Sequence, residues 1–440
     1  MANTYLTRTP SSTGNQQKVT FSVWIKRCKL GGEAIYSIGG AVDQNYYVDL
    51  IFDSDFLEMN WYDGSGNHSI KTNRLFRDTS AWYHLVVAID TTQSTASNRV
   101  KIYVNGILET SFSSADYMNQ NQNMLFNTSS RQIRIGQRVN GSDSANIIMS
   151  HFHCADGTAY APTVFGETDS TTGEWKIKVS PSFTLGTNGF TILKDGNTIT
   201  DQSANSNNFS LGGGTLTKTE DSPSNVFATW NPLQATTSAS YDFSAGNTRM
   251  AVNDAAVFSL GATLAAKTGK YYMEMKWVQQ GGNGSWGMIP INTNIKNRPR
   301  NAGVGWNQGD NAPWLLGSIV SGSWGGSIGT GDIIQLAMDL DNGAFYFGKN
   351  GTYLNSGNPT SGASKTGAVD FSGTTMFGED ITFAIGKGAS GTDGWNANFG
   401  NGYFEQTAVS SAGTNASGNG IFEYDVPTGF TALSTKGLNT

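Results

Sequence analysis

The sequence predicts an all-β protein: two tandem antiparallel β-sandwich domains, an irregular connector between them and a short C-terminal tail. Three observations lead to this fold class. Charged residues make up only 14% of the chain while glycine occurs 54 times, which is typical of short strands joined by polar loops. No stretch sustains the i, i+3, i+4 apolar spacing of an amphipathic helix. The 440 residues also exceed the size that one core usually serves.

Residues 82–107, WYHLVVAIDTTQSTASNRVKIYVNGI, give the strongest strand signal. Two runs rich in β-branched and aromatic residues flank a polar segment, which predicts two antiparallel strands and their loop. In the second run Val100, Ile102 and Val104 alternate with polar or amphipathic residues, as in a half-buried strand. Asn105-Gly106 supplies the positive φ angles of a tight hairpin, so a return strand is expected over residues 107–112.

Similar alternation predicts strands on either side of this pair. Residues 19–26 place Phe21, Val23 and Ile25 on one face. Because this strand lies so near the N-terminus, we expect no separate anchoring domain before it. Further strands are expected over residues 46–52, 56–62, 132–136 and 146–153.

The blocks WYHLVVAIDTTQSTASNRVKIYVNG, IRIGQ and HFHCADGTAYAPTVFGE, in this order, resemble the laminin-G-like, concanavalin-A-like jelly roll found in bacteriophage virion proteins. The resemblance covers residues 1–180 and implies a jelly-roll sandwich there. It also implies that residues 155–177 follow the last jelly-roll strand and pack beneath it.

The second half predicts another sandwich. Residues 270–278, KYYMEMKWV, alternate an apolar face with one that carries Tyr272, Glu274 and Lys276. Residues 331–340 then run into the reversal DNG, and residues 344–347 lead to KNG. The series GKYYMEMKW, GDIIQLAMDLDNGAFYFGKNG and DITFAIG resembles a SPRY (B30.2-like) domain, which is also a β-sandwich.

These signals divide the chain into four parts. The first sandwich occupies residues 1–180, the second residues 232–405 and the tail residues 406–440. Residues 181–231 are rich in Gly, Asn and Ser but also hold several phenylalanines, which predicts an ordered, irregular connector. The tail ends in VPTGFTALST, which resembles the closing motif of phage proteins with this architecture and predicts that the tail docks.

Charge and composition exclude several kinds of function. The net charge of −6 and the absence of a Lys/Arg cluster argue against nucleic-acid binding. No apolar run approaches the roughly 20 residues of a membrane span, and the N-terminus lacks a basic-then-apolar signal region. We therefore expect synthesis in a cytoplasm without membrane insertion. Cys28 and Cys154 do not make a disulfide framework and are expected to be two reduced core thiols, although neighbouring strands could bring them together.

Enzymatic residues are not evident. A retaining glycosidase needs two carboxyl groups about 5–5.5 Å apart, and the strand pattern Glu-x-Asp-x-x-Glu that would supply them does not occur. The nearest acidic pairs are Asp53/Asp55, Asp339/Asp341 and Glu379/Asp380, and no GxSxG motif is present. We therefore predict a protein that is not an enzyme.

No cofactor or transition metal is expected. His151 and His153 share a strand face and could chelate zinc, but a paired core or surface role is favoured because the other ligands are missing nearby. Laminin-G-like domains sometimes hold calcium at the sandwich rim. A structural calcium is therefore kept as an alternative, without assigned ligands. Its oxygen ligands would come from loops that hold Asp53, Asp55, Asp63 and Asp156.

Aromatic residues in polar loops are the candidates for ligand binding. Flat rings on a rigid sandwich can hold the face of a sugar while amide and carboxylate groups bind its hydroxyls. The candidates for glycan binding are Trp286, Trp306, Trp314 and Trp324, and the smaller pair Trp61 and Tyr62. The alternative is that two or three of the four tryptophans in the second half fill its core.

The two resemblances and the tail motif together imply a structural protein of a tailed-phage virion. We expect a non-enzymatic tail fibre or tail-tip appendage that binds host-surface polysaccharide and other virion proteins. A homo-oligomer is expected, and the resemblance implies a trimer. A virion adaptor or head decoration protein is the alternative, and a polysaccharide depolymerase is a more distant one.

Overall fold

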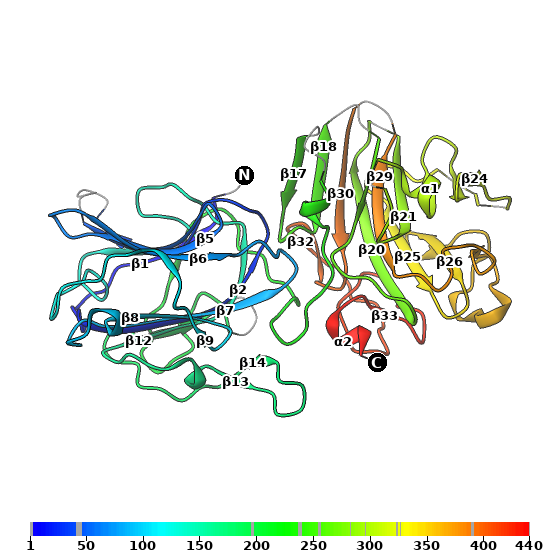
Figure 1. Ribbon diagram of the computed structural model, residues 1–440. Coiled ribbons are helices and arrows are strands. Elements are labelled where there is room, and N and C mark those ends of the chain that lie inside the picture. The colour runs from blue at the N-terminus through cyan, green and yellow to red at the C-terminus, as the bar shows by residue number, and fades with distance from the viewer. Residues whose placement is uncertain are drawn as a thin grey trace. The chain divides into compact units, whose positions relative to one another are not determined.

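The computed structural model describes residues 3–40, 46–194, 198–235, 240–253, 257–281, 283–294, 296–322, 324–325, 327–388 and 391–439. Figure 1 shows a nearly all-β chain, so the predicted fold class is confirmed. The chain divides into two compact units, Met1–Lys218 (unit 1) and Thr219–Thr440 (unit 2). Each unit is a sandwich of mainly antiparallel sheets with its own core.

Unit 1 contains two main sheets. Sheet A is formed, in spatial order, by β10 (Phe112–Ala115), β6 (Asn67–Leu75), β5 (Phe56–Tyr62), β4 (Tyr47–Asp53), β3 (Glu33–Gly39), β11 (Gln132–Ile135), β1 (Tyr5–Arg8) and β16 (Ser210–Gly213). Sheet B is formed by β15 (Phe190–Ile192), β12 (Ile147–Asp156), β2 (Lys18–Arg27), β7 (Trp82–Asp90), β8 (Val100–Val104) and β9 (Ile107–Leu108).

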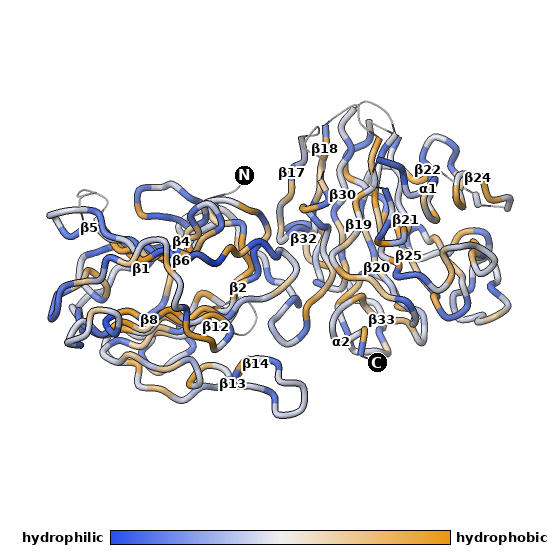
Figure 2. Tube along the Cα trace, viewed as in Figure 1, coloured by the Kyte–Doolittle hydropathy of each residue, from blue (hydrophilic) through white to orange (hydrophobic). Residues whose placement is uncertain are grey.

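The core of unit 1 lies between sheets A and B, because each strand turns its apolar row inward. In β2 that row is Val19, Phe21, Val23 and Ile25, as its alternation predicts. Figure 2 shows apolar stretches along strands such as β8 and β12 and hydrophilic stretches in many of the loops. The return strand predicted over residues 107–112 is shorter than expected: only β9 stays in sheet B. Buried Glu109 then forms an ion pair with Arg74, and the chain crosses to sheet A.

A third layer covers the outer side of sheet B in unit 1. It holds η2 (Pro162–Val164) and the hairpin of β13 (Gly166–Thr168) and β14 (Trp175–Ile177), which lies outside β8 and β12 in Figure 1. The indole Nε1 of Trp175 donates to Nδ1 of His84 on β7 at 2.9 Å, and Phe165 stacks on His153 of β12. The predicted packing of residues 155–177 beneath the jelly roll is therefore confirmed.

The residues predicted as a connector are divided between the units. Phe190 and Phe209 join the core of unit 1, where β15 pairs with β12 and β16 pairs with β1. Phe227 packs instead with the C-terminal residues of unit 2.

Unit 2 also contains two main sheets. Sheet C is formed, in spatial order, by β17 (Ser240–Ser244), β18 (Arg249–Asn253), β30 (Thr392–Asn398), β20 (Lys270–Gln279), β25 (Ile333–Asp339), β26 (Ala344–Lys349) and β27 (Thr352–Tyr353), with β28 (Val369–Asp370) on β26 and β33 (Thr431–Ala432) on β20. Sheet D is formed by β19 (Phe258–Gly261), β29 (Ile381–Lys387), β21 (Gly284–Pro290), β22 (Val304–Asn307), β23 (Ala312–Leu315) and β24 (Ser318–Ile319).

The C-terminal tail docks on the outer side of sheet C. Phe422, Val426 and Phe430 pack with Tyr272 and other outward-facing residues of that sheet. Below them, the buried carboxylate of Glu274 accepts hydrogen bonds at 2.8 Å from the backbone N–H groups of residues 423 and 424. The tail is thus a packed part of unit 2, as its aromatic ending predicts.

The remaining elements are short. They are η1 (Ala96–Asn98), η3 (Pro232–Gln234), α1 (Pro299–Ala302), η4 (Pro359–Ser364), α2 (Thr435–Leu438) and the pair β31 (Tyr403–Phe404) and β32 (Thr407–Ala408). Over the described ranges no helix has the length and apolar character of a membrane span.

The two cysteines do not meet. Cys154 pairs with Phe21 near the start of β2, whereas Cys28 follows the end of that strand. At about 3.3 Å per residue the two thiols lie roughly 20 Å apart along the sheet. Both are buried, and neither takes part in a disulfide.

Candidate functional site

Four of the six aromatic candidates for glycan binding lie inside the two cores. Trp286 and Trp306 are opposite each other on β21 and β22, and both are 0% exposed. Trp324 is 4% exposed in the same core, and Trp61 is 1% exposed in the core of unit 1. A ring buried this deeply has no face left for a sugar. The structure therefore corrects the prediction for these four residues, which pack the sandwiches.

The period-two pattern of the sequence could have revealed that Trp286 and Trp306 are core residues. Trp286 and Met288 alternate with small residues on β21, and Val304 and Trp306 do the same on β22. Alternation of a large apolar residue with glycine or serine is typical of a strand with one face in a core.

The other two candidates remain partly accessible on outward faces of the sheets. Tyr62 lies on sheet A of unit 1 and Trp314 on sheet D of unit 2, and both are half-exposed. They belong to different compact units, so each surface is described by itself.

Tyr62 belongs to a polar surface that we call outer face A. It consists of the side chains that alternate with the core residues of adjacent strands in sheet A. Asp49, on β4, lies opposite Asn60 of β5 and Ser37 of β3, and Asn60 lies opposite Ser69 of β6. In the next row, Tyr47 lies opposite Tyr62. Outer face A comprises Ser37, Tyr47, Asp49, Glu58, Asn60, Tyr62, Asn67, Ser69 and Lys71.

Hydrogen bonds hold one side of outer face A rigid. The hydroxyl of Ser37 donates to Oδ1 of Asp49 at 2.5 Å, and Nη2 of Arg138 lies 2.7 Å from Oδ2 of the same carboxylate. The guanidinium of Arg138 also lies 5.5 Å from the ring centre of Tyr47, and the Tyr47 hydroxyl donates to Asn67 at 2.9 Å. Tyr47 is therefore fixed from two directions.

The other side of outer face A has groups left over for a ligand. Tyr47, Tyr62, Asn60 and Ser69 are half-exposed. Aromatic rings beside amide and hydroxyl groups present both the apolar area and the hydrogen-bonding groups that suit a sugar ring.

Outer face A also holds two carboxyl groups on adjacent strands, a pair that no local acidic motif in the sequence indicates. Asp49 is opposite Asn60 and Ile51 is opposite Glu58, so Asp49 and Glu58 are diagonal neighbours, with Cα atoms about 7–8 Å apart by strand geometry. Burial raises the pKa of both groups. Asp49, however, is 1% exposed, and both of its oxygens are engaged by Ser37 and Arg138. Cross-strand register, which the sequence alone did not give, was the missing signal.

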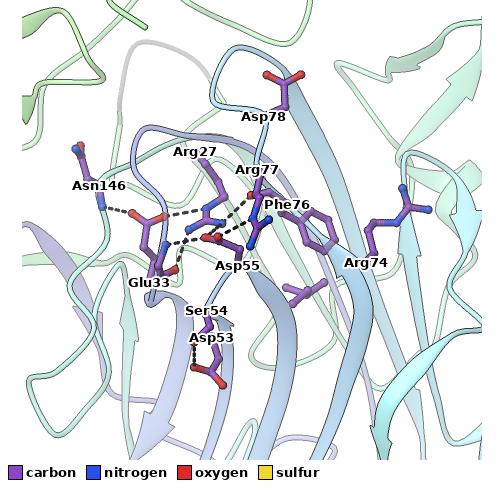
Figure 3. A network of polar contacts seen from close by, with 12 residues as sticks. Arg27, Glu33, Asp53, Ser54, Asp55, Arg74, Phe76, Arg77, Asp78 and Asn146 are labelled. Carbon is purple, nitrogen blue, oxygen red and sulfur yellow. Dashed lines mark hydrogen bonds and ion pairs between the residues drawn. The ribbon is translucent and has the colours of Figure 1, made fainter. Parts of the chain in front are cut away.

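A second charged cluster lies near one end of the unit 1 sandwich (Figure 3). Arg27 donates from Nε to Glu33 at 3.0 Å, and from Nη1 to Asp55 at 3.0 Å and to the carbonyl of Phe76 at 2.7 Å. Burial raises the pKa of Glu33 to about 7, against the attraction of Arg27. Perturbed carboxyl groups can mark active sites. Here, however, the side chains of Arg27 and Glu33 are fully buried, and the cluster ties β2, β3 and two turns together.

The acidic residues singled out from the sequence have separate partners. Asp53 pairs with Lys71, and Asp55 with Arg27 and Arg77. Asp339 pairs with Lys270 at 2.9 Å and accepts from the amide of Asn342, whereas Asp341 accepts from the backbone of Gly269, so both shape a turn. Glu379 and Asp380 are exposed.

The residues considered for metal binding are likewise dispersed. Asp63 lies 3.4 Å from His68, and Asp156 accepts from the backbone of Asn15. His153 bonds through Nδ1 to Thr191 at 2.9 Å, and Nδ1 of His151 contacts the Ser150 hydroxyl at 2.7 Å. Within the described ranges no group of three or more His, Cys, Asp or Glu residues is placed to hold a metal ion.

Comparisons with known proteins found a family model that matches the first part of the chain. Residues 2–156 match a laminin-G-type family model described as the concanavalin A-like lectin/glucanases superfamily. No curated protein matches the sequence.

Among solved structures, the SPRY domain of human HERC1 is similar at 11% identity and a TM-score of 0.29, over 38% of this chain and 96% of that one. A heptameric SAP-like pentraxin from Limulus polyphemus gives 16% identity and a TM-score of 0.23, over 33% and 69%. Domain 4 of AbnA, a GH43 extracellular arabinanase from Geobacillus stearothermophilus in complex with arabinotriose, gives 20% identity and a TM-score of 0.26, over 36% and 68%. The family match covers most of the sandwich that carries outer face A, and the concanavalin A-like fold is compatible with carbohydrate binding.

Proposed function

We propose that this chain is a non-catalytic saccharide-binding protein and that outer face A of unit 1 is its binding surface. Tyr47 and Tyr62 would support the apolar face of a sugar, and Asn60 and Ser69 would bind its hydroxyls. The observation that carries the proposal is the adjacent cross-strand rows of half-exposed aromatic and hydrogen-bonding side chains.

In its biological setting, the proposed protein is an exposed appendage of a tailed-phage virion, such as a tail fibre or tail tip. The sequence blocks shared with phage jelly rolls and the VPTGFTALST ending support this setting. The proposed partners are other virion proteins and the host-surface polysaccharide. A homo-oligomer, for which we expect a trimer, would repeat the weak saccharide contact several times and raise the overall affinity.

A binding experiment tests outer face A directly. The full chain is screened on a glycan array, and the best oligosaccharide is titrated by calorimetry against wild type, Tyr62→Ala and Asn60→Ala. Each substitution is expected to weaken binding about tenfold, which corresponds to about 1.4 kcal/mol for a lost ring contact or hydrogen bond.

The matched control is Tyr103→Ala, which removes a half-exposed tyrosine from β8 in the opposite sheet of the same unit. Its affinity should equal that of the wild type. If no oligosaccharide binds, or if the control weakens binding as much as Tyr62→Ala, then the proposed function is wrong.

One observation favours a second candidate function, hydrolysis of a polysaccharide. Asp49 and Glu58 share outer face A as diagonal neighbours on adjacent strands, and glycosidases use a pair of carboxyl groups. Ser37 and Arg138 already bind the two oxygens of the Asp49 carboxylate, which argues against a role in hydrolysis. Release of reducing ends from the bound oligosaccharide, abolished by Glu58→Gln, would favour the hydrolase over the binding protein.

A further inference from the structure

A cationic site is built on the outer side of sheet D in unit 2, around the half-exposed Trp314. Trp314 on β23 lies opposite Gly305 of β22. Helix α1 packs against these strands, and a Cβ at Gly305 would clash with the backbone of Arg300. Glycine at this position therefore lets α1 lie close to the sheet and brings Arg300 beside Trp314.

Trp314 and Arg300 hold each other in place. The guanidinium of Arg300 lies 4.4 Å from the ring centre of Trp314. One carboxylate oxygen of Asp310 accepts from Nε1 of Trp314 at 3.0 Å and from Nη1 of Arg300 at 3.2 Å, and it also accepts from the amide of Asn307. The ring, the cation and the carboxylate form a fixed group at the surface.

Arg298 brings a second positive charge, which has no carboxylate partner among the residues that the structure describes. Its guanidinium lies against the backbone of Gly388 and makes no hydrogen bond or ion pair with the described residues. The residue is half-buried, and burial lowers its pKa, with a further contribution from the charge of Arg300. Asp310 is therefore the one carboxylate paired with these two arginines among the described residues, which leaves the site with an excess positive charge.

Further polar and apolar groups border the arginines. On one side, the loop after β22 carries the side-chain amides of half-exposed Gln308 and exposed Asn311. On the other side, Ile319 lies opposite Trp314 and is 57% exposed. The surroundings thus combine accessible amide groups with an exposed apolar area.

We propose that this cluster is a second saccharide site, on unit 2, that takes an acidic sugar. The carboxylate of the sugar would pair with the accessible parts of the Arg298 and Arg300 guanidinium groups, since guanidinium groups favour carboxylates. The apolar face of the sugar would lie on Trp314 and Ile319, and its hydroxyls would bond to the side-chain amides of Gln308 and Asn311. This site is independent of outer face A, which carries no comparable excess of arginine.

The test compares one oligosaccharide in two charge states. The full chain is titrated by calorimetry and tryptophan fluorescence with a trimer of galacturonic acid and with its methyl ester, which keeps the hydroxyls and loses the charge. The acidic trimer is expected to bind at least tenfold more tightly at low ionic strength, and this preference is expected to shrink as salt screens the charge.

Variants assign the preference to the site. Arg298→Gln and Arg300→Gln should each reduce the preference for the acid several-fold while the melting temperature of unit 2 stays within about 2 °C, because a partly exposed arginine contributes little to stability. Arg131→Gln, a half-exposed arginine of unit 1, is the matched control and should leave the preference unchanged.

Three results would overturn the proposal: equal binding of the acid and its ester, a loss of preference in Arg131→Gln, or equally tight binding of a tri-aspartate peptide. Tyr62→Ala should not alter the acid preference, so a failure here is distinguishable from a failure of outer face A. Conversely, a loss of neutral-sugar binding in Tyr62→Ala would support outer face A and would not affect the proposal for the site at Arg298 and Arg300.

Discussion

At the scale of single residues, buried polar groups decide how the layers of this protein are joined. Trp175 donates its Nε1 hydrogen to Nδ1 of His84, which requires the other ring nitrogen of His84 to carry the proton. That nitrogen lies 2.9 Å from the hydroxyl of Ser22. Burial lowers the pKa of His84 to about 3, so the ring stays neutral at physiological pH. One tautomer of one histidine thus links the third layer of unit 1 to sheet B.

Replacing Trp175 with Phe tests this link. The variant keeps an aromatic ring but leaves Nδ1 of His84 without its donor, and we expect unfolding by denaturant to require about 1–3 kcal/mol less. Nitrogen-15 shifts of the His84 ring should also show a mixture of tautomers. Lys176→Gln, at an exposed neighbour, is the control. An unchanged stability and tautomer in Trp175→Phe would show that packing alone holds the layer.

Arg27 is the second residue that joins separate segments. Its substitution by Met would leave Glu33 buried without its cation and Asp55 paired with Arg77 alone. We expect a loss of about 3–5 kcal/mol in the free energy of unfolding, which Arg27→Met combined with Glu33→Gln should partly restore. Arg77→Gln removes a cation that is 60% exposed from the same Asp55 and should cost less than about 1 kcal/mol. Equal losses in Arg27→Met and Arg77→Gln would contradict this account.

At the scale of elements, strands were predictable from sequence where one face is apolar and less so where the sheet is polar. The alternation over residues 56–62 and 270–278 predicts β5 and β20 closely. No strand was expected over β6, since NHSIKTNRL has few apolar residues and is held by its neighbours β5 and β10. Long-range pairing supplies what local propensity lacks.

The same reasoning explains how much of the candidate site was predictable. Tyr62 and Trp314 were identified by their rings, but outer face A depends on cross-strand register, which brings Asp49, Asn60 and Ser69 into one row. Arg298 and Arg300 gave no signal, because their importance comes from folding, which leaves Asp310 as the one carboxylate paired with the two arginines among the described residues. Such features arise from tertiary structure and leave no periodic trace in the sequence.

The C-terminal tail provides a prediction at this scale. Glu274→Leu removes the acceptor for two backbone N–H groups, at residues 423 and 424, and each buried unpaired group costs about 1–3 kcal/mol. We expect the tail to detach, so that hydrogen exchange at these amides accelerates and proteases cut within residues 406–420. Glu379→Gln, an exposed glutamate of the same unit, is the control and should leave the tail protected. Unchanged exchange in Glu274→Leu would mean that apolar packing suffices.

At the scale of the whole molecule, buried ionisable groups give the two units different responses to pH. In unit 1, burial lowers the pKa of His84 and His153 to about 3, so their contribution to stability is present above the ordinary histidine pKa and is lost on acidification. Burial of Glu33 opposes part of this effect. In unit 2, burial raises the pKa of Glu274 from 4.5 to about 7.

The stability that Glu274 contributes changes with pH in the opposite direction to that of the histidines. The folded unit binds the proton more tightly than the unfolded chain, so the contribution is complete below pH 4.5 and is lost as the pH rises through 7. We expect unit 2 to lose up to about 1.4 kcal/mol per pH unit across this range. Scanning calorimetry between pH 5 and 8 would measure it, and Glu274→Gln should flatten the dependence. A flat wild-type profile would contradict the assignment.

The pairing of β16 with β1 and of β15 with β12 limits how the chain can be cut for study. A fragment that stops at residue 156, where the family match stops, would lack both closing strands and would expose the edges of β1 and β12. Open edges recruit other chains, so such a piece is expected to aggregate. Recombinant work on the first half should therefore keep every residue through Lys218.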